Sequence, residues 1–284
     1  MKSTLFLAVL LLVAFIAYGR SGHGGDHRGR ADRTSTWEPA ERRGSNPETG
    51  TTAGVRSDCA EKYVGGRPPV IPAVQARNAT TLCYSAFASL SSPATRTPLW
   101  AAEALTPASI GVARDTERVS EFHAEPGLDR DARAELGDYR RSGYDRGHLA
   151  PSGDMPGLKA QQESFTLANI VPQSGDLNRG SWADLESDVR SLAARRDAVY
   201  VVTGVLFDGS AIRRTPSGRV SVPSSMWKAI ASPGEGSVVM VASNDDEPTW
   251  RTLPVAQFTR DTGIDPFPGL TGADRGNLLR IGGR

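Results

Sequence analysis

Residues 198–205 carry the pattern that most restricts the fold, a continuous run of apolar and β-branched side chains. A short run of this kind is typical of a strand buried on both faces of a sheet. Other apolar runs predict strands at residues 81–88, 97–103, 165–171, 226–230 and 238–242. The 30 glycines and 19 prolines favour many turns over a helix bundle. The chain is therefore expected to build a sheet.

One segment has clear helical periodicity. Residues 181–195 carry apolar side chains on a single helical stripe, formed by Trp182, Leu185, Val189 and Leu192. A charged, alanine-rich segment predicts another helix at residues 129–139. The 284 residues suffice for one large domain or two small ones, and no internal repeat is visible.

The first helical segment also carries polar groups along one edge. Glu186 and Arg190 are spaced i, i+4 on the flank of the stripe, and Asn178 lies just before the helix begins. At about 100° per residue, the three side chains point into the same region of space. An alternative interpretation is a helix cap plus a surface ion pair worth about 0.3–0.5 kcal/mol.

The amino-terminal segment predicts export. Residues 1–19 combine Lys2 with a short apolar stretch and a small-x-small cleavage sequence, as in a signal peptide; an uncleaved signal anchor is the alternative. The polar composition of residues 20–57 predicts a disordered linker, and residues 58–284 are expected to form the folded domain. The protein is thus expected to be secreted or periplasmic, or else membrane-anchored and facing outside the cytoplasm.

Cys59 and Cys83 are the only cysteines. In an oxidising compartment, an even pair most simply forms one disulfide. The bond would close a loop of about 25 residues, worth on the order of 3 kcal/mol in the chain-entropy model. Two cysteines cannot build a thiolate zinc site.

The charge composition excludes a strong global field. The formal net charge is +1, so the overall charge does not indicate a nucleic-acid partner. A local basic cleft is still compatible with this net charge. Four lysines leave 29 arginines among the 33 cationic residues. Arginine suits bidentate phosphate contacts, but genomic codon bias explains the same preference.

The chemistry is concentrated in residues 144–151. This segment crowds Asp145, Arg146 and His148 around a glycine, and Pro151 prevents helix continuation. Two of the four histidines lie in the predicted linker, so a three-histidine zinc site cannot form in the folded domain. The sequence also lacks an H-E-x-x-H motif, a P-loop, an EF-hand loop and a G-x-S-x-G elbow. His148 alone could equally be a hydrogen-bonded structural residue.

The D-R-G-H sequence at residues 145–148, with Asp154-Met155 and the segment at residues 176–186, resembles the DNA/RNA non-specific endonuclease family of ββα-metal nucleases. The resemblance extends from about Cys59 to Ile281. It implies an α+β fold with a central, mostly antiparallel sheet flanked by helices. It also implies a sugar-non-specific endonuclease that hydrolyses phosphodiester bonds of DNA and RNA.

The resemblance implies roles for three central residues. His148 would be the general base that activates the attacking water. Asn178 would be the single protein ligand of a hydrated Mg²⁺ ion, with Mn²⁺ as an alternative. Glu186 would form hydrogen bonds with the waters on that ion.

Five further residues receive supporting roles from the same resemblance. Arg146 and Arg190 would contact the phosphate, and Arg118 matches the upstream arginine in a segment of variable length. Asn169 would support the site, and Asp145 would orient its own loop without binding the metal. These roles are chemically reasonable, because phosphodiester cleavage requires positive charge near the phosphate more than covalent assistance.

Two other classes of function stay open from sequence. One is a nucleic-acid-binding protein without catalytic activity, which would not require His148, Asn178 or Glu186. The other is a metal-dependent phosphodiesterase acting on a small or lipid substrate. The expected partners are DNA and RNA, bound through phosphate and sugar. An inhibitor protein is unidentified, and a stable membrane partner is expected only if residues 1–19 form an uncleaved anchor.

Overall fold

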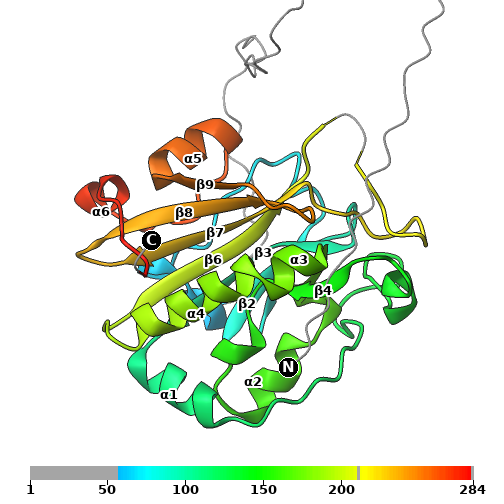
Figure 1. Cartoon of the computed structure of the whole chain (residues 1–284), viewed down its shortest axis with the longest axis horizontal. Helices are drawn as coiled ribbons and strands as arrows, with labels where there is room; N and C mark the ends of the chain where they lie inside the picture. The colour runs from blue at the N-terminus through cyan, green and yellow to red at the C-terminus, as the bar shows by residue number, and fades with distance from the viewer. Residues whose placement is uncertain (1–56, 210–211, 283–284) are drawn as a thin grey trace, which may run out of the picture. The chain divides into compact units, whose positions relative to one another are not determined.

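The computed structural model describes residues 57–209 and 212–282 (Figure 1). The predicted export segment and residues 20–56 of the predicted linker lie outside the described residues. Within the described ranges, no helix is both long and apolar enough to cross a membrane.

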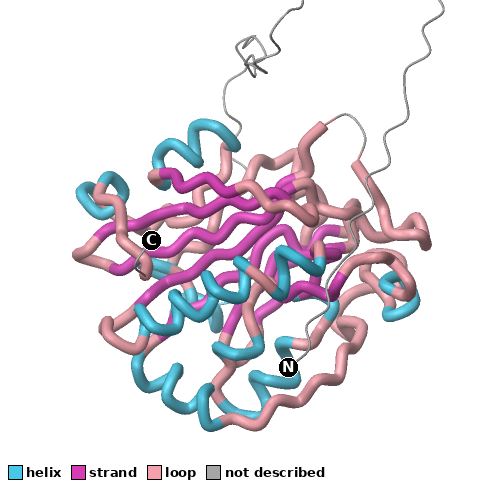
Figure 2. Tube along the Cα trace, in the orientation of Figure 1, coloured by secondary structure: helices cyan, strands magenta, loops and turns pink. Residues whose placement is uncertain are grey.

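The centre of the domain is a seven-stranded sheet in which all neighbouring strands are antiparallel (Figures 1 and 2). In spatial order the strands are β1 (Thr80–Cys83), β2 (Phe87–Ser92), β3 (Thr97–Leu105), β6 (Val199–Leu206), β7 (Ser225–Ser232), β8 (Gly236–Ser243) and β9 (Trp250–Leu253). The most apolar predicted strand, β6, is the middle strand. Its position explains the run of hydrophobic residues, because a central strand covered on both faces has no polar side.

A smaller unit stands beside this sheet. Strands β4 (Asp145–His148) and β5 (Ile170–Gln173) form an antiparallel pair, and helices α3 (Gly175–Arg179) and α4 (Ser181–Ala193) follow directly. This succession is the ββα unit, and the whole domain has the expected α+β architecture.

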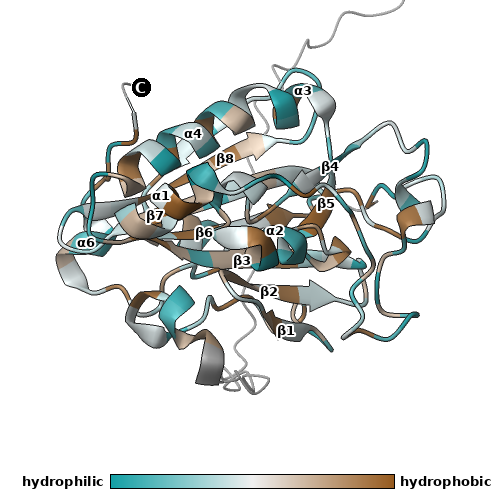
Figure 3. Ribbon diagram, turned by 90° about the horizontal axis from the view of Figure 1, so that it is seen from below, coloured by the Kyte–Doolittle hydropathy of each residue, from teal (hydrophilic) through white to brown (hydrophobic). Residues whose placement is uncertain are grey.

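Helix α4 covers one face of the large sheet, as Figure 1 shows. All four residues of its predicted apolar stripe are buried, and Trp182 stacks on Trp250 with 5.9 Å between ring centroids. Figure 3 shows hydrophilic and hydrophobic residues mixed along α4, as expected for a helix with one face in water. Helices α1 (Pro107–Asp115) and α2 (Gly157–Ser164) contribute Ile110 and Ala160 to the same layer.

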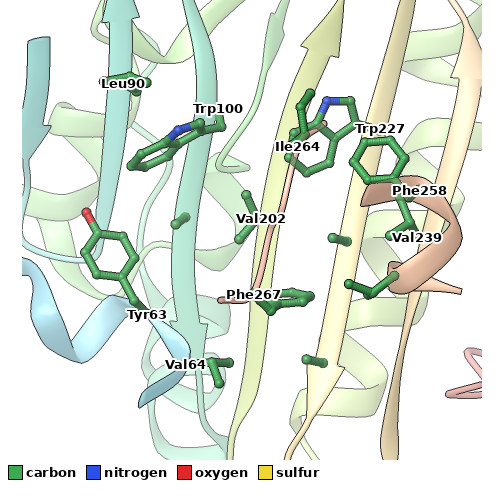
Figure 4. Packing of buried hydrophobic residues seen from close by; sticks show 14 of the residues in the cluster. Tyr63, Val64, Leu90, Trp100, Val202, Trp227, Val239, Phe258, Ile264 and Phe267 are labelled. Carbon is green, nitrogen blue, oxygen red and sulfur yellow. The ribbon is translucent and has the colours of Figure 1, made fainter. Parts of the chain in front are cut away.

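The other face of the sheet has a separate core, drawn in Figure 4. Helix α5 (Val255–Thr262) packs Phe258 against Trp227 of β7, with 5.1 Å between ring centroids. Tyr63 meets Trp100 of β3 at 6.1 Å. The sheet is therefore the middle layer of three. The remaining short helices are η1 (Ser57–Lys62), η2 (Val64–Gly66), η3 (Leu136–Tyr139), η4 (Ser152–Asp154), η5 (Leu167–Asn169) and α6 (Gly272–Gly276).

The predicted disulfide is present. Cys59 of η1 is bonded to Cys83 at the end of β1, with 5.8 Å between the two Cα atoms. The bond fastens the start of the described chain to the edge strand of the sheet.

The predicted helix at residues 129–139 is wrong. Only the short η3 forms there, and the preceding residues are turns. Arg133 donates hydrogen bonds to the backbone carbonyls of Glu125 and Leu128, while Asp138 forms an ion pair with Arg219 at 3.2 Å. These tertiary contacts outweigh a weak local helix propensity.

Two predicted strands also differ from the structure. Residues 81–88 are not one strand: residues 81–83 end β1, residues 84–86 turn the chain, and residues 87–88 begin β2. In this turn the Ser85 backbone N–H donates to Glu163 of α2 at 2.7 Å. In the stretch at residues 165–171, the strand begins only at Ile170 and continues through Pro172. A proline is tolerated there because β5 pairs with β4 alone and is an edge strand. The other four predicted strands are confirmed as β3, β6, β7 and β8.

Candidate active site

Close pairing of β4 and β5 positions the D-R-G-H segment. Gly147 is paired with Val171, and a Cβ atom at Gly147 would overlap the side chain of Gln173. Only glycine fits this close approach of the two strands. The paired segment is a strand, and His148 is its last residue.

Aromatic rings enclose the imidazole of His148. Its ring lies 4.8 Å from that of Phe165 and 5.6 Å from that of Phe122, measured between centroids. Arg146 stacks over Phe122 at 4.1 Å, and Arg118 lies over Phe165 at 5.7 Å. The same two rings therefore hold both the imidazole and two guanidinium groups.

This environment favours the neutral imidazole. Burial is the main cause that lowers the pKa of His148, and the positive charges of Arg118 and Arg146 lower it further, to about 3. The Nε2 atom is covered and has no hydrogen-bond partner among the described residues. A neutral imidazole can accept a proton.

Asn169 holds the backbone directly after His148. Its buried side chain accepts a hydrogen bond from the Ala150 N–H and donates to the Ala150 carbonyl, each at 2.9 Å. A further bond runs from its amide to the Ser164 carbonyl at 2.9 Å. Asn169 is therefore a structural support of the segment that carries His148.

A carboxylate fixes the orientation of Asn178. The Asn178 Nδ2 donates to Asp145 Oδ2 at 2.9 Å, and Arg179 also donates to Asp145. This contact joins α3 to β4 and leaves the Asn178 amide oxygen without a donor among the described residues. Asp145 thus orients Asn178 as well as its own loop.

The free amide oxygen fits a hydrated hard cation. Mg²⁺ keeps several waters and needs few oxygen ligands from the protein. The described residues contain no group of three or more His, Cys, Asp or Glu side chains that could hold a metal ion. Asn178 is the residue that would hold such an ion, because its Nδ2 is engaged and its oxygen is not.

Glu186 and Arg190 belong to a second group of charges on α4. Arg190 Nη1 donates to Asp154 Oδ1 at 3.0 Å, and this carboxylate is buried. Burial is the first cause that raises the pKa of Glu186, to about 7, and Asp154 also raises it; Lys228 and Arg190 oppose the shift. Glu186 can therefore hold or release a proton near neutral pH.

Two residues of this charged group were missed by the sequence analysis. Lys228 of β7 is 1% exposed, and Glu103 of β3 is 2% exposed. Lys228 donates to Thr203 of β6 at 2.6 Å and lies 5.3 Å from the Trp182 ring. The strand register puts these side chains on the sheet face beneath α4. A lone lysine inside the apolar segment at residues 226–230 was the available sequence indication.

Glu103 is also displaced toward its neutral form. Burial raises its pKa, and the charge of Asp154 adds to the shift. Its Oε2 has no hydrogen-bond partner among the described residues. The charged group thus contains three carboxyl groups, those of Glu103, Asp154 and Glu186. It contains only two cations, Lys228 and Arg190.

The predicted site residues therefore fall into two connected groups. Arg118 and Arg146 surround His148, while Glu186 and Arg190 lie over the buried charges. Asn178 is joined through Asp145 to the strand that carries His148. The arrangement can accept a proton at a neutral imidazole, bind an anion with arginines and seat a hydrated cation.

Comparison with known proteins agrees with this fold. The family model for DNA/RNA non-specific endonuclease matches residues 70–273. "Nuclease 1, mitochondrial" of Schizosaccharomyces pombe is 34% identical over 163 residues, which cover 55% of this chain and 49% of that protein. "Endonuclease G, mitochondrial" of Bos taurus is 33% identical over 203 residues, covering 67% and 65%.

A solved structure is similar as well. A chain of the EndoG/EndoGI complex superposes with a TM-score of 0.64 at 26% identity, covering 70% of this chain and 89% of that one. The ββα unit and the D-R-G-H strand thus define a ββα-metal nuclease fold. The chain belongs to the DNA/RNA non-specific endonuclease family. It spans about half to two thirds of the length of the two relatives named above.

Proposed function

We propose that the protein is a divalent-metal-dependent endonuclease that hydrolyses phosphodiester bonds of both DNA and RNA, with His148 as the general base. The observation that carries this proposal is the neutral imidazole of His148 beside Arg118 and Arg146, which stack on the same two rings. Family membership supports the substrate class. Contacts to phosphate and sugar carry no base identity, so cleavage is expected to be independent of sequence.

His148 would accept the proton of the attacking water at its neutral imidazole ring. A pKa near 3 makes the free imidazole a weak base, because two guanidinium groups repel its protonated form. A substrate phosphate between Arg118 and Arg146 would offset these positive charges. The pKa of His148 would then rise toward the working pH, where general-base catalysis is more efficient. Substrate binding would thus activate the base.

The remaining residues would stabilise developing negative charge. A metal ion held by Asn178, with Mg²⁺ as the preferred candidate, would supply positive charge and acidify its bound water. Glu186 would accept hydrogen bonds from water at the ion, and Arg190 would face the phosphate with the donors not engaged by Asp154. Asp145 would keep the amide oxygen of Asn178 pointed toward the ion.

Asn178→Ala separates catalysis from binding. Plasmid DNA and RNA would be incubated with Mg²⁺, with Mn²⁺ and with EDTA, and DNA affinity would be measured in EDTA. The variant should lose metal-dependent turnover yet keep its DNA affinity, because the metal acts mainly in the transition state. Equal losses of affinity and turnover would contradict a metal role for Asn178. A wild-type protein that cleaves neither polymer would contradict the nuclease proposal.

Export is a separate proposal that rests on residues 1–19. The two relatives named above carry "mitochondrial" in their names. Expression of the full chain in a bacterial host, with fractionation and amino-terminal sequencing, tests the proposal. Processed protein outside the cytoplasm is the expected result, and unprocessed cytoplasmic protein would contradict it. An inhibitor protein for this chain is also a proposal, supported by a similar structure being an EndoG/EndoGI complex.

A further inference from the structure

Residues of α1, η4 and α4 line a cavity of about 270 Å³. Helices α1 and α4 lie on one side of the sheet (Figure 1), the side of the candidate site. The walls of the cavity are formed by Ile110, Arg114, Gly153, Ser187, Arg190 and Ser191. None of these six residues is acidic, whereas two are arginines and two are serines. The chemistry of the walls therefore favours an anion that accepts several hydrogen bonds.

Several hydrogen-bond donors on the cavity walls have no partner among the described residues. Ser187, Arg190 and Ser191 are spaced i, i+3 and i+4 on α4, so they share one face of the helix. Neither serine hydroxyl nor the Arg114 guanidinium has a hydrogen-bond partner among the described residues. Arg190 uses Nη1 for Asp154, which leaves its other N–H groups available. These are the donors that phosphate oxygens bind best.

The wall at Gly153 lies close to Arg190. A Cβ atom there would lie 3.1 Å from Nη1 of Arg190. Glycine therefore leaves room for the guanidinium between η4 and the open cavity.

The cavity adjoins the candidate active site without coinciding with it. The two share Arg190, and Arg114 precedes Arg118 by four residues. Arg118 acts on His148, whereas Arg114 lies in the last turn of α1 and is exposed. A polynucleotide carries a phosphate at every nucleotide, so a strand bound at the site presents further phosphates beside it.

We propose that this cavity is a second phosphate subsite, in which Arg114, Ser187 and Ser191 bind a backbone phosphate that is not being cleaved. The proposal rests on the proposed nuclease function and adds a binding position to it. Polynucleotide substrates would gain affinity from the subsite, whereas a substrate with one phosphodiester could not use it.

Arg114→Ala tests the subsite, and Arg260→Ala is the matched control. Arg260 is also exposed in the last turn of a helix, but α5 covers the opposite face of the sheet. Affinity of the full chain for single-stranded oligonucleotides would be measured in EDTA at several salt concentrations. Turnover of bis(p-nitrophenyl) phosphate, which has a single phosphodiester, would be measured with Mg²⁺.

Arg114→Ala should weaken oligonucleotide binding several-fold and reduce the slope of log affinity against log salt by about 0.7, the value for one lost phosphate contact on a single strand. Turnover of the one-phosphate substrate should stay at the wild-type rate, and Arg260→Ala should bind like the wild type. Wild-type affinity and salt slope for Arg114→Ala would overturn the subsite. Equal weakening in both arginine variants would also overturn it, since it would indicate a general charge effect. The affinity measurement needs no turnover, so failure of the nuclease proposal would be recognised separately.

Discussion

His148 and Glu186 lie in two regions that control charge by different means. Burial favours the neutral form of both side chains. Around His148, two exposed arginines reinforce the effect of burial, and both are available to a phosphate. Around Glu186, the neighbouring charges largely oppose one another, because Asp154 raises the pKa while Lys228 and Arg190 lower it. The pKa of the His148 imidazole should therefore change strongly when substrate binds. The protonation state of Glu186 should instead be set by the charges inside the protein.

Removal of the imidazole should have the largest effect on activity. His148→Ala should reduce turnover by at least about 10²-fold, the usual size of general-base catalysis. Metal binding should survive, since Asn178 and Asp145 belong to the neighbouring contact between α3 and β4.

His123→Ala is the control, because His123 is the other described histidine and its exposed ring borders the carbonyl of Glu121. Initial rates on plasmid DNA, with metal affinity measured in parallel, compare the two variants. Wild-type turnover in His148→Ala would remove the base from the mechanism.

Loss of the buried cation should mainly affect stability. Lys228→Met keeps an extended apolar side chain but leaves the surrounding carboxyl groups with less compensation. Removing one partner of a buried ionic group typically costs about 3–5 kcal/mol. Urea unfolding at pH 7 should therefore show a strongly reduced free energy of unfolding.

The double variant Lys228→Met/Glu103→Gln should recover part of this loss, because it removes a carboxyl group from the unbalanced cluster. A double-mutant cycle measures the coupling. Strictly additive effects of the two substitutions would show that Lys228 and Glu103 do not interact.

The contact between Asp145 and Asn178 joins α3 to the strand that carries His148, and its loss should have an intermediate effect. Asp145→Asn weakens the acceptor that orients the Asn178 amide. Substitution of a residue that orients a metal ligand typically lowers metal affinity by about 10–100-fold.

The metal concentration that gives half-maximal turnover should rise accordingly, and saturating metal should restore most of the rate. Glu121→Gln, at an exposed position, serves as the control. An unchanged metal requirement in Asp145→Asn would show that the contact does not position Asn178.

The smallest expected effects concern stability as a function of pH. The folded pKa of His148, about 3, is below its ordinary value of 6.5, so the unfolded state binds more protons between these values and acid destabilises the fold. The folded pKa of Glu186, about 7, is above 4.5, so raising the pH through that interval destabilises the fold. The two slopes have opposite signs between pH 4.5 and 6.5.

Denaturant unfolding of His148→Gln and Glu186→Gln across this interval measures both slopes. Relative to wild type, His148→Gln should lose stability as pH rises, whereas Glu186→Gln should gain it. Each difference is limited to about 1.4 kcal/mol per pH unit for one proton. Slopes of the same sign would contradict the comparison between the two regions.

Local pattern was a good guide wherever burial is regular. The strands at residues 198–205 and 226–230 and the apolar stripe of α4 are confirmed, because continuous apolar runs and a repeat of 3.6 residues are both visible in the sequence itself. Pattern failed at residues 129–139, where Arg133 binds backbone carbonyls of the preceding turn and Asp138 pairs with the distant Arg219. Secondary-structure patterns, which depend on neighbouring residues, do not predict such contacts.

The sequence by itself determined the chemical groups of the candidate site, since the motif at residues 145–148 and the spacing of Asn178, Glu186 and Arg190 are visible in one dimension. Only the tertiary structure decided their charge states and supports. Lys228, Glu103 and Asp154 come from three separate segments and meet beneath α4 only when the sheet forms. Their effect on Glu186 depends on burial and on distances through space, and neither quantity is defined until the chain has folded.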